Sequence, residues 1–589
     1  MILPLFAREL TETAARRRTY TMRAVFGVML YTVFLLTVNR VISKAGVTSG
    51  SFAVLGTGRE LFARLVEFLC WSVLLFQPAL VAGRLTYEKE RESLSLLLLT
   101  GMSPGRIVLE KYFAGLLPMV SLLLLGLPAG AITMGYGGVS PALIGAGVGV
   151  VAATCIQTAA LGIFSSAWCR TTTGAISLSY GLVALVHFSM PALAALWGWY
   201  FAGEDGVRET PEWGSILWPP DVFQRIMAAQ DSAGGSAIEI AALTWEHCRA
   251  LVASGVVFLL FSTLVVERRA TTPASTNRIA RKVAVKAGRV IRWWRKFWPV
   301  RRDLPGDSPV SWRESGRGIL GGRGRFARLV FWLSLGTLLL CVGLYRLPPL
   351  AGGAARIQVL GMFIGAAMVI VLVTRSTGSL LDERVNQTLD ILLTTRLGAR
   401  EILRQKVEAL TRYRVLFWLL LAIVFAAQGW SLFSYVRANM SVRGLAQFFF
   451  CGTIAATVYP AMIIWLSMLV ALLVQSKVRA VVITVTILAV WFAGPLLVLD
   501  FAYDNWRMDS TGRWLALTSP LGILDANAND RLAYFATEAI RAGRKVTTTG
   551  SPGAGVAYNF TIYSILTLVL RWTCFLLAER ALRTMKRGS

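Results

Sequence analysis

Histidines, paired cysteines and nucleotide-binding loops are scarce or missing in this sequence, and each absence excludes a kind of chemistry. The only two histidines, His187 and His247, lie far apart. We therefore expect no enzyme active site and interpret His187 as a hydrogen-bonded residue within a helix, with a copper site beside Met190 as the weaker alternative. The seven cysteines form no CxxC pair, which argues against a disulfide framework or a zinc site. No GxxxxGK[ST] loop occurs, so the chain is not itself an ATPase.

Acidic residues are also few, with 32 Asp and Glu against 60 Lys and Arg and a formal net charge of +28. Residues 278–302 concentrate the basic side chains and contain no acid. Such a cluster suits a nucleic-acid patch, but the chain is 55% hydrophobic with a mean hydropathy of +0.59. In a membrane protein, basic clusters stay on the cytoplasmic face beside anionic lipid. We therefore expect the lipid bilayer, and no nucleic acid, as the partner of this region.

Long apolar runs are what the sequence has in abundance. A helix needs about 20 apolar residues to cross the hydrocarbon core. Runs of this kind lie near 24–43, 64–83, 112–134, 141–167, 173–198, 249–266, 326–346, 357–381, 413–433, 446–474, 480–500 and 556–577. The sequence thus predicts an all-α polytopic membrane protein with about twelve transmembrane helices. We divide it into a first six-span half (1–266), a basic linker (267–325) and a second six-span half (326–589).

The sidedness of these spans follows from the placement of Lys and Arg. The connector 267–328 carries 17 basic residues against four acids, whereas the loop 199–248 carries eight acids against two bases. The loop 501–555 is nearly balanced and adds little. No small-residue cleavage site follows the first apolar run, so we read it as a retained span. We expect both termini and the connector in the cytoplasm, with the tryptophans of 292–299 placing a helix in the membrane interface.

Residues 83–111 align without a gap with residues 378–406, at an offset of 295. We call these the aligned segments; both lie between the second and third predicted span of their half. A weaker similarity relates a helix before each first span, where Arg8 and Glu9 match Arg313 and Glu314. Each half has an even number of spans, so the halves are parallel repeats rather than inverted ones. The identical residues of the aligned segments are Gly83/Gly378, Leu85/Leu380, Glu88/Glu383, Leu94/Leu389, Leu97/Leu392, Leu98/Leu393, Thr100/Thr395, Ile107/Ile402 and Lys111/Lys406.

The first aligned segment reads as a short amphipathic helix, a break at Pro104, and a helix leading into the third span. Its leucines recur at helical spacing, and glutamates crowd its start. Its apolar face packs against the protein's own spans, lies in the headgroup layer, or docks into a soluble partner. Acid at the same place in both segments, Glu88 and Glu383, favours a partner, because anionic lipid repels carboxylates.

These segments resemble the cytoplasmic signature of type-2 ABC exporter permeases: an E-rich stretch, a [TS]-L-x-x-L-L-x-T core, a short break and an I-x-x-x-K motif before the third span. The resemblance implies that each segment is a coupling helix that sits in a groove of an ATP-binding subunit. The second segment departs from the first at Gln387, Ala399 and Glu401, which replace Glu92, Pro104 and Arg106. The residues that the resemblance assigns to ATPase coupling are Glu88, Glu92, Leu94, Leu97, Thr100, Lys111, Glu383, Leu389, Leu392, Thr395 and Lys406, with Arg8, Glu9, Arg313 and Glu314 on the helices before the first spans.

By this resemblance we expect a transporter permease with both halves in one chain, which exports its substrate across a bacterial inner membrane. It would bind no cofactor, and ATP would be used by two cytosolic ATPase subunits, identical or different. The substrate is left open. One alternative is a secondary transporter of the six-plus-six kind, against which stands the lack of carboxylates in mid-span. The other is a membrane scaffold that recruits a cytosolic protein without transporting anything.

Overall fold

The computed structural model describes residues 6–7, 11, 17–49, 56–91, 93–200, 217–231, 237–271, 308–317, 323–346, 353–385, 397–435, 442–505, 518–520 and 552–587. Throughout these ranges, all regular secondary structure is helical. Ten helices of the described residues are long and apolar enough to cross a membrane. The protein is therefore an all-α polytopic integral membrane protein, as the sequence predicts.

The chain forms two compact units, which we describe separately. Unit 1 comprises Met1–Ser275 with Asp500–Met508, and unit 2 comprises Thr276–Leu499 with Asp509–Ser589. Each unit contains one of the two aligned segments.

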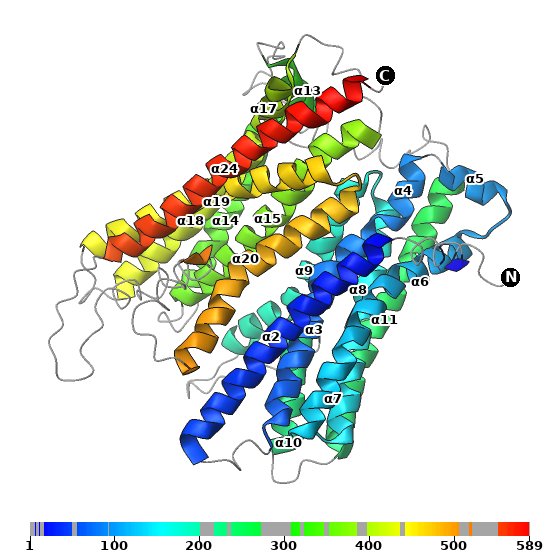
Figure 1. The fold of residues 1–589 in the computed structure, drawn as a ribbon, viewed down its shortest axis with the longest axis vertical. Coiled ribbons are helices and arrows are strands. Elements are labelled where there is room, and N and C mark those ends of the chain that lie inside the picture. The colour runs from blue at the N-terminus through cyan, green and yellow to red at the C-terminus, as the bar shows by residue number, and fades with distance from the viewer. Residues whose placement is uncertain are drawn as a thin grey trace. The chain divides into compact units, whose positions relative to one another are not determined.

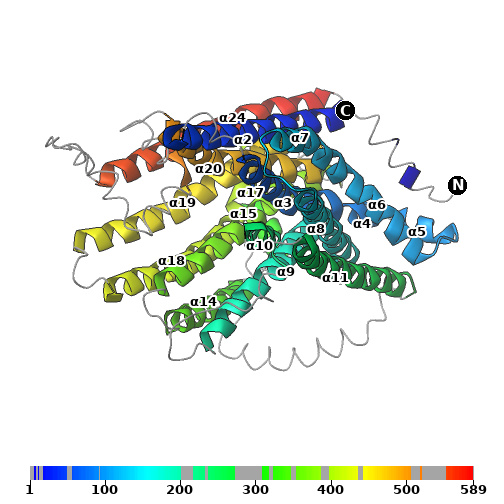
Figure 2. The same cartoon turned by 90° about the horizontal axis from the view of Figure 1, so that it is seen from below.

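Unit 1 is built around α8, which packs against α3, α6, α9, α10 and α11 (Figures 1 and 2). Five of the six runs predicted in the first half each coincide with part of one helix, and the run near 112–134 is divided among α6, η2 and α7. The helices are α2 (Arg17–Ser49), α3 (Gly58–Ala82), α4 (Arg84–Glu90), α5 (Ser93–Leu99), α6 (Pro104–Leu123), the 3-10 turn η2 (Leu124–Gly126), α7 (Leu127–Gly135), α8 (Pro141–Trp168), α9 (Thr172–Tyr200), α10 (Pro219–Asp231) and α11 (Ala237–Thr271).

Two sequence features shape these helices. A Cβ atom at Gly162 of α8 would lie 2.9 Å from the Cβ of Val81, so the close approach of α3 and α8 requires glycine there. The third helix of the unit is interrupted at η2, just before Pro128. Proline has no N–H to donate to the preceding turn, which explains the interruption at this point.

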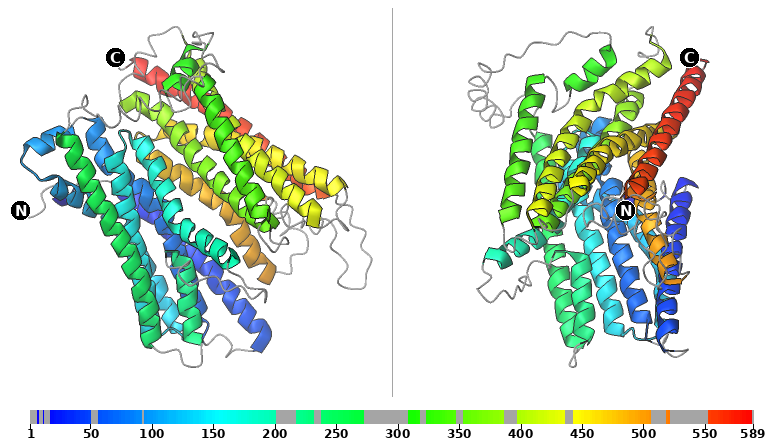
Figure 3. Two further views of the ribbon diagram at one scale, coloured as in Figure 1. Left: turned by 180° about the vertical axis from the view of Figure 1, so that it is seen from behind. Right: turned by 90° about the vertical axis from the view of Figure 1, so that its left-hand side faces the viewer.

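In unit 2, α19 packs against α15, α18 and α24, and the short helix α13 packs against α17 (Figure 3). Each of the six runs predicted in the second half coincides largely with a helix. The helices are α13 (Pro309–Arg317), α14 (Arg323–Arg346), α15 (Gly353–Val385), α17 (Ala399–Ala409), α18 (Thr411–Tyr435), α19 (Val442–Leu473), α20 (Lys477–Asn505, which belongs to unit 2 as far as Leu499) and α24 (Pro552–Arg587).

Candidate functional site

The first aligned segment folds as two short helices and the start of a long one. Helix α4 follows α3 across Gly83, α5 packs beside α4, and α6 begins at Pro104. In Figure 1, α4 and α5 lie at the end of unit 1 where α6 begins. Between α5 and α6, Gly101 has a φ of 79°, a left-handed conformation that glycine adopts without strain. The chain therefore turns sharply after α5, and α5 lies in none of the ten apolar spans.

The leucines of α5 divide between two faces. Leu94 and Leu97 pack against the buried core of unit 1, which includes Leu85 and Ile107. Leu96 and Leu99 point away from that core and are 63% and 82% exposed. Leu94 and Leu97, which the sequence predicts to contact a partner, are thus partly buried against unit 1 itself. The outward apolar surface of α5 is formed by Leu96 and Leu99.

A buried ion pair joins α4 to α6. The Nζ atom of Lys111 lies 2.9 Å from Oε1 of Glu88, and the two side chains are only 6% and 20% exposed. The second carboxylate oxygen of Glu88 accepts a hydrogen bond from the hydroxyl of Ser93, the first residue of α5. Glu88 therefore connects three helices: α4 that carries it, the start of α5, and α6.

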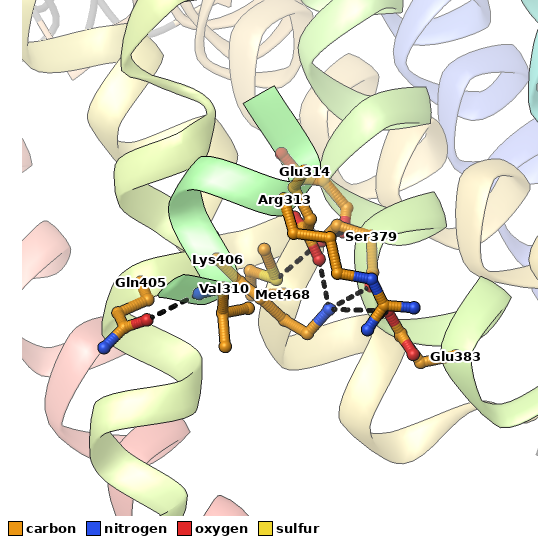
Figure 4. Close-up of polar contacts among 9 residues, drawn as sticks. Val310, Arg313, Glu314, Ser379, Glu383, Gln405, Lys406 and Met468 are labelled. Atoms are coloured by element: carbon orange, nitrogen blue, oxygen red, sulfur yellow. Dashed lines mark hydrogen bonds and ion pairs between the residues drawn. The ribbon is translucent and has the colours of Figure 1, made fainter. Parts of the chain in front are cut away.

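Unit 2 contains a similar cluster around Lys406, formed with Glu314, Glu383, Arg313 and the carbonyl of Ser379 (Figure 4). Lys406 of α17 is fully buried, and its Nζ forms an ion pair with Glu314 of α13. The same Nζ donates to the carbonyl of Ser379 at 2.7 Å and lies 3.9 Å from Oε1 of Glu383, both on α15. Arg313 of α13 lies 4.0 Å from the same carboxylate oxygen. Lys406 thus joins α13, α15 and α17.

Burial sets the electrostatics of Glu314. It raises the pKa of this carboxyl above its ordinary value, and the neighbouring charge of Glu383 raises it further, while Lys406 and Arg313 oppose the change. Because a carboxylate loses its hydration in such a position, the lysine is needed to keep it charged.

A second hydrogen bond occurs at aligned positions in both units, but the donor and the acceptor change places. In unit 1, Glu110 accepts a hydrogen bond from the backbone N–H of Phe6 at 3.2 Å and from Nε of Arg106 at 2.9 Å. In unit 2, the aligned residue Gln405 accepts from the backbone N–H of Val310 at 3.0 Å. Its amide nitrogen donates to Glu401, the residue aligned with Arg106, at 3.0 Å.

The aligned segments also donate hydrogen bonds to the end of the fourth long helix of each unit. Lys89 donates to the carbonyls of Ser166 and Ala167, each at 2.6 Å, at the end of α8. The aligned residue Arg384 donates to the carbonyl of Ala471, near the end of α19, at 3.5 Å. Cations at this end of a helix satisfy carbonyls that have no partner within the helix and oppose the helix dipole.

The beginnings of the next helices are tied to the same region. The backbone N–H of Thr172, which starts α9, donates to Glu90 at 2.8 Å. Lys477, which starts α20, lies 2.5 Å from Asp382 in an ion pair. The residues that follow α3 in unit 1, and those at the end of α15 in unit 2, are therefore bonded to α6, α8 and α9 in unit 1, and to α17, α19 and α20 in unit 2.

Several predicted site residues lie outside the described residues. Thr100 is described, and its exposed hydroxyl donates to the carbonyl of Leu97 at 2.6 Å. Sequence reasoning did not single out Lys89/Arg384 and Glu110/Gln405, although each pair directly adjoins an identical pair of the alignment. The predicted residues outside the described ranges are Arg8, Glu9, Glu92, Leu389, Leu392 and Thr395.

Among the described residues, no three or more His, Cys, Asp or Glu side chains are grouped so as to bind a metal. His187 instead lies with its Nδ1 2.7 Å from the carbonyl of Leu217. Neither a protein-family model nor a curated protein sequence matches the chain.

Proposed function

We propose that the chain is the membrane permease of an ATP-driven exporter, with both halves fused and its ATPase supplied by separate cytosolic subunits. The supporting observation is α5, a short helix outside the apolar spans that exposes Leu96 and Leu99 while its other face is fixed to unit 1. The resemblance to coupling helices of type-2 ABC permeases suggests the same use.

The arrangement suits docking because the exposed leucines sit on a rigid base. Leu94 and Leu97 are packed below them, and the Glu88–Lys111 ion pair and the Ser93 hydroxyl fix the start of the helix. Two adjacent leucine side chains facing water gain free energy when a partner's groove covers them, at roughly 25 cal/mol per Å² of apolar area. An ATPase subunit that binds α5 would thereby be attached to the part of the permease that touches the third, fourth and fifth long helices.

The test is purification from native membranes in mild detergent, followed by identification of co-purified proteins and an assay of ATP hydrolysis. The wild-type protein should bring down a protein with a P-loop. The double variant Leu96→Glu, Leu99→Glu should lose it, because charged side chains cannot enter an apolar groove.

The matched control is Leu96→Met, Leu99→Met, which keeps the surface apolar and should retain the ATPase. Absence of any P-loop protein from the wild-type preparation would contradict the proposal. Equal recovery with the double glutamate variant would contradict the docking site.

A further inference from the structure

We propose that Lys111 and Lys406 are positioning residues that transmit movement of the ATPase-docking segment to the third long helix of each unit. This inference rests on the proposed function. The observation that carries it is the same ion pair at aligned positions: Lys111 with Glu88 in unit 1 and Lys406 with Glu383 in unit 2.

Each lysine lies where such movement would have to pass. Lys111 is in α6, which runs on into the third span, and Lys406 is in α17, which leads into α18. Their carboxylate partners lie on the other side of the docking segment, at α4 and at the end of α15. In unit 1, the ion pair therefore bridges the chain on either side of α5, and in unit 2 it joins α15 to α17.

The other groups around the lysines reinforce the bridge. Glu88 is bonded to Ser93, so a displacement of α5 acts on the carboxylate that Lys111 binds. In unit 2, Glu314 forms an ion pair with Lys406, and Arg313 lies near Glu383, so α13 is joined to the same cluster. Each lysine thus joins elements that are separate in the chain.

A contribution to stability alone does not explain why a buried ion pair occupies this position. A buried ion pair is often no more stabilising than well-packed apolar side chains of similar volume, because both ions lose their hydration. Directional ion pairs instead fix one arrangement of the elements they join, a role best attested in registers and switches. A connection of this kind moves its elements together, as a rigid-body transition between two states requires.

The experiment uses the whole chain with its co-purified ATPase in lipid nanodiscs. Single cysteines at Met134, in α7, or at Trp430, in α18, report on the third long helix of each unit; both residues are exposed. Their labelling by a water-soluble maleimide is measured with and without ATP, peptide by peptide, so that the native cysteines do not interfere.

In the parent complex, ATP should change the labelling rate at both positions. Lys111→Met should abolish the change at residue 134, and Lys406→Met the change at residue 430, while the ATPase is still bound and still hydrolyses ATP. The conservative variants Lys111→Arg and Lys406→Arg should keep the change. If a methionine variant does not fold, the reversed pair Glu88→Lys, Lys111→Glu replaces it, and it should restore the change that Glu88→Lys alone removes.

The matched control is Lys477→Met, which removes another buried lysine with an acidic partner in unit 2, at the start of α20 rather than before α18. It should leave the change at residue 430 intact. An unchanged ATP response in Lys111→Met and Lys406→Met would overturn the inference, as would an equal loss in Lys477→Met or no ATP response in the parent complex. Failure of the proposed function is seen separately, as absence of an ATPase from the wild-type preparation.

Discussion

Units 1 and 2 share two contacts at aligned positions: in one, the hydrogen-bond donor and acceptor change places, and in the other the residue types are the same. At the first, Arg106 donates to Glu110 in unit 1, whereas Gln405 donates to Glu401 in unit 2. At the second, a lysine meets a glutamate in both. The comparison shows which property matters at each place: a hydrogen bond between two turns of a helix at the first, and a positive charge facing a carboxylate at the second.

Removing the lysines should have the largest effect and should separate the units. Lys406→Met removes the closest cation from Glu314 and leaves Glu383 with only the more distant Arg313, which should lower the free energy of unfolding by about 3–5 kcal/mol. Lys111→Met should cost less, about 1–3 kcal/mol, because Glu88 is more exposed and keeps its bond to Ser93. Unfolding in mixed micelles of mild detergent and dodecyl sulfate, followed by tryptophan fluorescence, measures both.

The corresponding Lys→Arg variants serve as controls for charge and should lose less than either methionine variant. Equal losses from Lys111→Met and Lys406→Met would show that the extra partners of Lys406 add nothing.

Transplanting the exchanged contact tests whether the two versions are interchangeable. Arg106→Glu alone places a new carboxylate one helical turn from that of the buried Glu110 and should destabilise unit 1 by about 1–3 kcal/mol. Adding Glu110→Gln reproduces the unit 2 pair and should recover most of the loss. The double-mutant cycle, measured by the same unfolding titration, should give an interaction free energy of about 0.5–3 kcal/mol. Strict additivity of the two substitutions would refute the interpretation.

The cations at the ends of α8 and α19 should differ in strength. Lys89 lies 2.6 Å from two carbonyl oxygens, whereas Arg384 lies 3.5 Å from one. Lys89→Met should therefore cost up to about 2 kcal/mol and Arg384→Met about 0.3–1 kcal/mol, the range for charges at helix ends. Hydrogen exchange of the last turn of α8 and of α19 reports each effect locally, with the other helix as internal control.

The smallest expected effect is on pH dependence. The pKa of Glu314 is raised in the folded protein from an ordinary value of 4.5, chiefly by burial. The folded state therefore binds this proton more tightly than the unfolded state, and its stability falls as the pH rises from 4.5 through the raised pKa. Unfolding titrations of the wild type and Glu314→Gln across this window should show that the variant lacks this slope. Identical slopes would mean that Glu314 titrates alike in both states.

The membrane helices were predictable because length and hydropathy alone define them. Their ends were not, since α11 begins at Ala237, whereas the apolar run begins near 249. The polar turns of such a helix are stabilised by tertiary contacts and leave no hydropathy pattern. The interruption at η2 likewise depends on local backbone chemistry at Pro128 within an otherwise continuous apolar run.

At the site, the alignment identified Glu88, Glu383, Lys111 and Lys406 as special but not as partners of one another. The members of the unit 1 pair are separated by 23 residues that include α5 and a sharp turn, and helical periodicity gives no information across such a break. Four consecutive leucines also hide which side of α5 faces inward, because every face of the helix then carries one. Only the packing of Leu94 and Leu97 against the core resolves that orientation.

The exposed pair Leu96 and Leu99 has a consequence for the life of the protein in the cell. If α5 docks an ATPase subunit as proposed above, a newly inserted chain leaves Leu96 and Leu99 uncovered until that subunit binds. Uncovered apolar surface of this kind promotes aggregation and recognition by chaperones and proteases. On that proposal, synthesis of the chain in excess of the ATPase should shorten its half-life, so that the docking surface also reports whether assembly is complete.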